Sequence, residues 1–145
     1  MKITFESEKS LPAFCKLISV LTDQAKVCVD DIHHDKVRGI VSIYMQRQDI
    51  VDFKKSFLGE MRPFYGQSMI KSLLTIKNVK EMNVEVDNQL ITDCNSCFTV
   101  LFGLKVDDNR LYLGSAEEAS GKILCQITIK VKELSIEFGD DENWA

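Results

Sequence analysis

The stretch Gly121–Phe138, GKILCQITIKVKELSIEF, decides the fold class of this chain. Its apolar residues alternate with polar ones at the two-residue period of a strand that buries one face. The alternation runs from Ile123 to Val131, slips by one residue, and resumes at Leu134. A β-bulge near Lys132–Glu133 would return these side chains to one buried face. The stretch therefore predicts a long strand in a sheet-rich protein.

Shorter segments with the same alternation or with β-branched residues predict further strands. The segments 26–31 and 36–47, which are joined by polar residues, are typical of an antiparallel hairpin. The turn residues Asp107–Asn109 predict a second hairpin. The predicted strands, besides the stretch above, are 1–5, 26–31, 36–47, 74–76, 82–86, 98–106 and 111–113.

Two segments have the spacing of amphipathic helices. Ser10–Leu21 repeats apolar residues at steps of three and four, with Pro12 in its first turn. Asp49–Arg62 has similar spacing and stops before Pro63. Because strands outnumber helices and follow one another directly, we expect an α+β protein. Its main element would be a predominantly antiparallel sheet or a partly closed barrel, with two helices.

Length and composition place the chain among ordinary globular proteins. Its 145 residues suit a single domain, residues 1–145, that ends in a short acidic tail at 139–145. A net charge of −4 disfavours a nucleic-acid partner. No stretch approaches the ~20 apolar residues of a membrane span, so we expect a cytoplasmic protein without a membrane partner. The five cysteines, an odd number, favour reduced thiols, and Cys15, Cys28 and Cys125 fall within apolar patterns typical of a core.

Known catalytic motifs are missing from the sequence. The glycines form neither a dinucleotide fingerprint nor a P-loop. The nearest approach to a nucleophile elbow, Gly66–Ile70, lacks its second glycine. We therefore assign no catalytic residue and no cofactor, and the sequence favours a protein that is not an enzyme.

The densest group of possible metal ligands is DDIHHD, residues 30–35. Its candidate ligands for zinc or another divalent transition metal are Asp31, His33, His34 and Asp35. On an extended backbone at most three side chains of the segment share a face, so a closed site needs a ligand from elsewhere. The alternative interpretation is a solvated connection between two strands of a hairpin.

Cys94 and Cys97 form a single CxxC motif. This spacing suits a zinc knuckle or a dithiol redox pair. However, no second CxxC or CxxH supplies further zinc ligands, and a strand pattern follows the motif where a thioredoxin-like site has a helix. The alternative is a pair of loop cysteines.

Two regions contain residue types that are common in protein interfaces. Phe64 and Tyr65 lie in a predicted loop at 63–68, and Trp144, the only tryptophan, lies in the acidic tail. Alternatively, Phe64 and Tyr65 cap the core beneath the loop. The alternative for Trp144 is a frayed, solvated terminus. The leading hypothesis is a small non-enzymatic binding or assembly domain. It would contact a protein partner or associate with itself through a sheet face or edge, Phe64–Tyr65 or Trp144.

Overall fold

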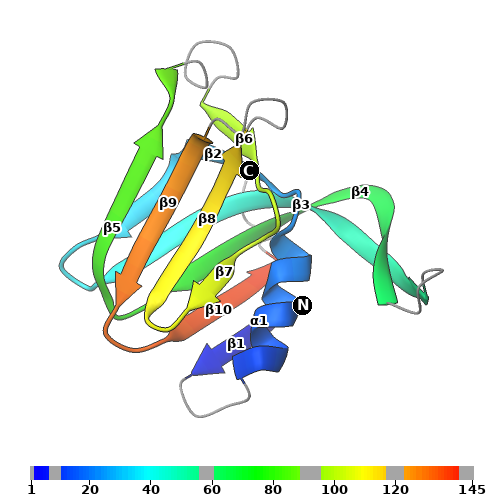
Figure 1. The fold of residues 1–145 in the computed structure, drawn as a ribbon, viewed down its shortest axis with the longest axis horizontal. Coiled ribbons are helices and arrows are strands. Elements are labelled where there is room, and N and C mark those ends of the chain that lie inside the picture. Colours follow the sequence, from blue (N-terminus) through cyan, green and yellow to red (C-terminus); the bar gives the residue numbers. More distant parts are fainter. Residues whose placement is uncertain (1, 7–10, 56–60, 89–95, 117–122, 141–145) are drawn as a thin grey trace.

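Two antiparallel sheets lie face to face in the computed structural model (Figure 1). It describes residues 2–6, 11–55, 61–88, 96–116 and 123–140, and only the backbone at 6, 51–55, 61–65, 67 and 116. One sheet has the order β1 (Lys2–Glu6), β10 (Ser135–Asp140), β4 (Met61–Ile76), β3 (Ile40–Lys55), β2 (Lys26–Asp35), β6 (Cys97–Thr99). The other has the order β5 (Val79–Val86), β9 (Ile123–Val131), β8 (Arg110–Ala116), β7 (Lys105–Asp107).

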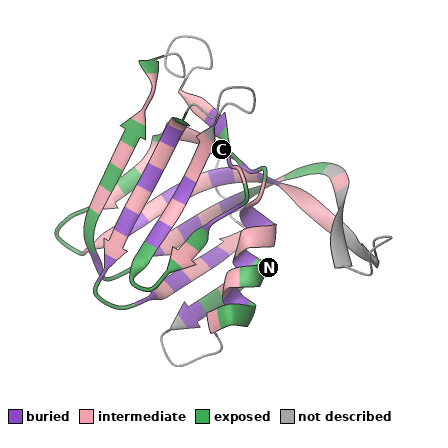
Figure 2. Cartoon of the chain, viewed as in Figure 1, coloured by how far each residue is buried: buried purple, intermediate pink, exposed green. Residues whose placement is uncertain are grey.

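The stretch Gly121–Phe138 contributes one strand to each sheet. β9 pairs with β5 and β8, whereas β10 pairs with β1 and β4. The prediction of one long strand with a bulge is therefore wrong, because the slip at Lys132–Glu133 is a change of sheet. At this crossing the Val131 amide donates to the Asn109 carbonyl at 3.0 Å. Both halves of the stretch bury alternate residues, since both face the space between the sheets (Figure 2).

The core fills the space between the two sheets and α1 (Leu11–Thr22), which confirms the predicted helix at Ser10–Leu21. The helix lies next to β7 and buries one face, and the Phe14 and Phe5 rings are 4.9 Å apart. Fully buried residues come from both layers, among them Val41, Ile43, Met45, Leu74, Leu111, Leu113, Ile127, Ile136 and Phe138.

The second predicted helix, Asp49–Arg62, is wrong. β3 continues through Lys55, β4 starts at Met61, and these two strands pair along their length. Strand pairing that begins in the core at Val41↔Ile76 continues outward, and this tertiary context outweighs a helical spacing of apolar residues. The predicted loop at 63–68 is part of β4. Beyond the body, the paired segments project as a ribbon, here called the arm: residues 48–55 of β3 and 61–70 of β4 (Figure 1).

Two other predicted strands have different limits in the structure. β2 includes all of residues 30–35, so this segment is not the hairpin connection, and the β2–β3 turn lies at Lys36–Gly39. The predicted strand 98–106 is two short strands, β6 and β7, in different sheets. The turn after Asp107 is confirmed by the pairing of Asp107 with Arg110.

The sheet-rich α+β class is thus confirmed, with separate sheets in place of a barrel and a single helix in the described part of the chain. In that same part, no helix has the length and apolar character to cross a membrane. Gly139 and Asp140, assigned to the tail, belong to β10, where they pair with Leu73 and Ser72.

Candidate functional site

The segment Val100–Leu104, here called the clamped loop, connects β6 to β7 across the C-terminal end of α1. The Phe102 amide donates to the Asp23 carboxylate at 2.8 Å, and the Phe102 carbonyl accepts from the Ser19 hydroxyl at 2.8 Å. The Leu104 amide donates to the Thr22 hydroxyl oxygen at 2.7 Å. These bonds attach the loop backbone to the last turn of α1 and to Asp23, the residue that follows the helix.

Two consecutive residues of the clamped loop have left-handed backbone conformations. Phe102 has φ 65° and Gly103 has φ 72°. A Cβ atom at Gly103 would lie 2.0 Å from the Ser19 carbonyl oxygen, so only glycine lets the loop approach α1 this closely. A positive φ is uncommon for a bulky residue and costs on the order of 1–3 kcal/mol. Despite this strained backbone conformation, the Phe102 side chain is not buried: it is 69% exposed.

A shallow hollow of about 220 Å³ lies beside the Phe102 ring. Gly114 is one of its lining residues, and a Cβ atom there would come within 2.7 Å of the Cys125 carbonyl oxygen. The surface is mainly apolar, and Ile123, which lines it, is 52% exposed. The hollow, here called the Phe102 pocket, is lined chiefly by Phe102, Lys105, Tyr112, Gly114, Ile123 and Gln126.

Lys105 adds a positive charge to the Phe102 pocket. Its Nζ atom lies 5.4 Å from the centre of the Phe102 ring, within the range of a cation–π interaction. Among the described residues Lys105 forms no salt bridge. The pocket thus combines an apolar surface with one cation, a combination that suits an apolar group adjacent to a negative charge.

A buried arginine and a partly buried aspartate lie where the arm leaves the body. The guanidinium of Arg47, which is buried, donates to Asp140 at 2.9 Å and to the Ser72 hydroxyl at 3.1 Å. These residues come from β3, β10 and β4, so the cluster ties three adjacent strands together. Burial alone would raise the pKa of Asp140, but the hydrogen bond and charge of Arg47 hold this pKa below its ordinary value. We call these three residues the arm root.

The structure places the four candidate metal ligands along β2 without gathering them into a site. His33 and His34 pair with Ser42 and Val41, so they project from opposite faces of the strand. The His33 ring meets Tyr44 edge-on at 6.0 Å. Asp35 accepts hydrogen bonds from the amides of Val37 and Arg38 at 3.1 Å and so forms the turn. Within the described residues, no three His, Cys, Asp or Glu side chains could hold a metal ion together. The described residues therefore provide no assembled set of ligands for the predicted metal site.

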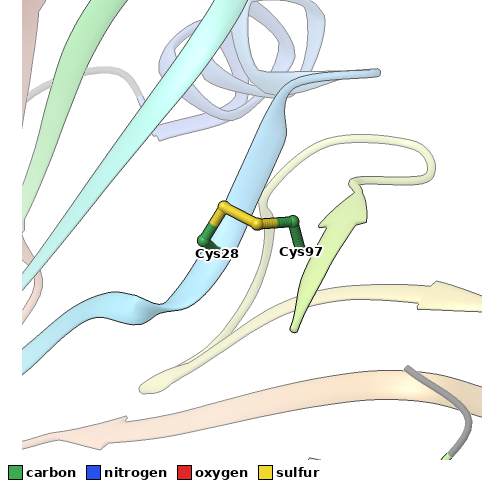
Figure 3. Close-up of a disulfide and its surroundings, with 2 residues drawn as sticks. All are labelled: Cys28 and Cys97. Carbon is green, nitrogen blue, oxygen red and sulfur yellow. A yellow bond between two sulfur atoms is a disulfide. The ribbon is translucent and has the colours of Figure 1, made fainter. Parts of the chain in front are cut away.

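Cys97 forms a disulfide with Cys28, with an S–S distance of 1.97 Å (Figure 3). The two residues are direct partners across β2 and β6, so the bond fixes an edge strand to its neighbour. The expectation of reduced thiols is wrong for this pair, and Cys28 is not a free core thiol. Cys94, the other residue of the CxxC motif, lies outside the described residues.

The remaining two described cysteines are free thiols. Cys125 is buried as predicted, and burial raises its pKa to about 11. Cys15 is half-buried, and burial raises its pKa as well. A raised pKa keeps a thiol protonated and therefore weakly nucleophilic at neutral pH. Neither residue has the low pKa of a reactive cysteine.

The three predicted interface residues lie in two regions. Phe64 and Tyr65 belong to the β4 part of the arm, where the structure describes the backbone and pairs them with Asp52 and Ile50. Trp144 lies outside the described residues. Their role in contacts therefore remains a prediction.

The sequence patterns alone do not single out Phe102 or Arg47. A Phe–Gly pair at 102–103 within an alternating segment is a sign that the strand breaks there, since glycine weakens strands and permits a positive φ. Arg47 continues the apolar alternation of Val41, Ile43 and Met45. A charged residue at a position expected in the core indicates a buried partner, although the sequence does not show which residue this is.

Comparisons with known proteins identify no relative: no protein family, curated protein or solved structure matches this chain. Functional inference therefore depends on the chain's own residues and geometry.

Proposed function

We propose that this chain is a non-enzymatic assembly domain that pairs with a second copy of itself through the edge of its arm. The observation that carries the proposal is the length of β3 and β4 beyond their neighbours. β2 pairs with β3 no further than Gln46, and β10 pairs with β4 no further than Ser72. Past these points, in the described residues, the two strands pair only with each other.

An isolated two-stranded ribbon is marginally stable in water, and each of its outer edges has unpaired backbone N–H and C=O groups. Adding strands satisfies these groups and stabilises the ribbon. Edge-to-edge pairing of two arms would create a four-stranded sheet with two-fold symmetry, the commonest arrangement of protein dimers. The arm is therefore suited to β-augmentation.

The charge pattern favours β3 as the paired edge and a second copy as the partner. Across Phe53, β3 changes from acidic at Asp52 to basic at Lys54. Antiparallel pairing of two β3 strands centred on Phe53 places Asp52 of each copy opposite Lys54 of the other, and opposite charges in such pairs are stabilising. The β4 edge is less suitable, since it contains Pro63, which lacks an N–H donor.

A charge-swap series with analytical ultracentrifugation tests the proposal. Asp52→Lys and Lys54→Asp each place like charges opposite each other twice in a symmetric dimer. Each variant should weaken dimerisation by about tenfold. The double variant restores opposite charges and should recover the wild-type dissociation constant. Asp30→Lys, a similar charge change at an exposed position of β2, is the control and should have little effect.

Two results would contradict this assembly mode. One is a wild-type protein that stays monomeric over the whole concentration series. The other is a dimer whose dissociation constant responds equally to the arm variants and to the control. The double variant separates specific pairing from an effect of net charge, because it leaves the net charge unchanged.

A further inference from the structure

The Phe102 pocket has the size of a site for one side chain. Its volume of about 220 Å³ is below the ~300–1,000 Å³ of typical small-molecule sites. Phe102 and Ile123, which line it, are among the exposed large apolar residues of the described chain. A large apolar side chain that covers both would remove their surface from water, which is favourable.

Gly114 leaves room for that side chain on the outer face of the second sheet. It lies inside β8, on the face opposite the buried Leu111 and Leu113. A Cβ atom at this position would meet the Cys125 carbonyl oxygen at 2.7 Å, so the backbone geometry keeps the position free of a side chain. A glycine inside a strand often marks a place where a ligand or another backbone approaches closely.

The charge of the pocket favours an acidic side chain beside the apolar one. Of the described residues that line the pocket, Lys105 alone is charged, and it forms no salt bridge with another described residue. A carboxylate would complement this charge. The amides of Phe102 and Leu104 already donate to Asp23 and Thr22. They are therefore not available to hold a chain-terminal carboxylate, which proteins bind through groups of backbone amides.

We propose that the Phe102 pocket binds an extended segment of a different protein, in which a large apolar side chain is followed directly by Asp or Glu. The apolar side chain would lie over Gly114 between Phe102 and Ile123, and the carboxylate would face Lys105. The site does not include the arm, so this proposal is independent of self-assembly through the arm.

The sequence around the chain's own exposed apolar residues favours a different protein over a second copy. Within the described residues, none of the exposed large apolar side chains is followed by Asp or Glu. These residues are Leu17, Val37, Met69, Phe102 and Ile123. The described surface therefore does not supply the required pair of side chains.

An amide NMR titration of the full-length chain with capped peptides tests the proposal. The probe is acetyl-Gly-Trp-Glu-Gly-amide, which should shift the amide signals of Phe102, Lys105 and Gly114. The matched peptide with Gln in place of Glu lacks the charge and should bind about threefold more weakly. The matched peptide with Ala in place of Trp lacks the ring and should bind at least about tenfold more weakly.

Variants of the chain assign each part of the affinity to its residue. Lys105→Gln should bind the Glu and Gln peptides equally, because the charge that distinguishes them is gone. Lys132→Gln, at an exposed lysine that does not line the pocket, is the control and should keep the threefold difference. Phe102→Asn removes the ring, keeps a residue that tolerates a positive φ, and should weaken binding by about tenfold. The exposed position of Lys105 keeps the test decisive if Phe102→Asn does not fold.

Three results would overturn the proposal. The first is a probe that leaves the signals of Phe102, Lys105 and Gly114 unshifted up to its solubility limit. The second is a wild-type chain that binds the Glu and Gln peptides with equal affinity. The third is tighter binding of acetyl-Gly-Trp with a free terminal carboxylate than of the probe, which would make the site one for a chain terminus.

Discussion

The clamped loop and the arm both leave the two-sheet core, but the structure supports their backbones in opposite ways. The loop donates and accepts hydrogen bonds along α1, and a disulfide lies just before it at Cys97. The arm is supported by pairing between its own two strands, and the arm root fixes only its base. A rigid loop can present a side chain without further ordering, whereas a ribbon with open edges gains stability on pairing.

The largest effect is expected from Gly103→Ala, which would break the clamped loop. The added Cβ atom meets the Ser19 carbonyl at 2.0 Å, and φ at this residue is 72°. We expect the free energy of unfolding to fall by about 4 kcal/mol, measured by urea denaturation. Gly39→Ala is the matched control: it has a similar φ of 67°, but its nearest atom is 3.2 Å away. That variant should lower the free energy of unfolding by about 1 kcal/mol. Equal losses in the two variants would contradict the close approach of Gly103 to α1.

Asp140→Asn should have the next largest effect, at the arm root. It removes the carboxylate that faces buried Arg47, and an unpaired buried charge costs about 3 kcal/mol. The pKa of Asp140 is lowered in the folded protein, so its ionised form contributes stability above the unfolded pKa. That contribution is lost as the pH falls through the folded pKa. Wild type and Asp140→Asn should therefore differ most near neutral pH, and the difference should shrink only as the pH falls below the ordinary pKa of 3.8 and through the lower folded pKa. A constant difference across this range would argue against the ion pair.

Thr22→Val should have an intermediate effect on the clamped loop. The Thr22 hydroxyl accepts from the buried Leu104 amide and donates to the Ile18 carbonyl at 2.6 Å. Valine leaves that amide without its acceptor, which should cost about 2 kcal/mol in thermal or urea unfolding. Ser19→Ala removes an exposed hydrogen bond to the same loop and should cost less than about 1 kcal/mol. If Ser19→Ala lowers the free energy of unfolding more than Thr22→Val does, the buried bond between Leu104 and Thr22 is not the main attachment of the loop.

The smallest expected effect is a difference in the stability of backbone hydrogen bonds between the arm and the core, which hydrogen exchange measures. Amides at 48–55 should exchange faster than the amides of Val41–Met45 in the same strand. The latter segment lies between β2 and β4, whereas the arm pairs on one side only. Raising the protein concentration should slow exchange in the arm if the arms pair, and should leave the clamped loop unchanged. Arm amides that are as slow as the core in dilute solution would remove the difference between the two regions.

Sequence periodicity predicted much of the sheet content, since alternation reports which residues face a core. It did not separate a bulge from a change of sheet at Lys132–Glu133, because either one restores the buried face after a slip of one residue. It also favoured a helix at Asp49–Arg62, since apolar residues at helical spacing can also occur in a strand. Pairing of β3 with β4 decided this segment, and pairing depends on residues distant in the sequence.

The residues of the candidate site were harder to predict than the fold. The Phe102 backbone is held at its carbonyl by Ser19 of α1 and at its amide by Asp23, just after α1, and these contacts join residues about 80 positions apart. Likewise, Arg47 and Asp140 are 93 positions apart in sequence. The disulfide shows the same difficulty: the CxxC motif directed attention to Cys94, while the strand register places Cys97 opposite Cys28.

The Cys28–Cys97 bond also determines how the chain would transmit mechanical tension. It closes a covalent ring between residues 69 positions apart, and this ring includes β3, β4 and β5. A force applied to the two ends of the chain would pass through the sulfur atoms and bypass the ring. Stretching could then extract α1 or β10, but the ring residues would add no contour length until the disulfide is reduced. The arm is thus part of a segment that tension on the termini cannot extend.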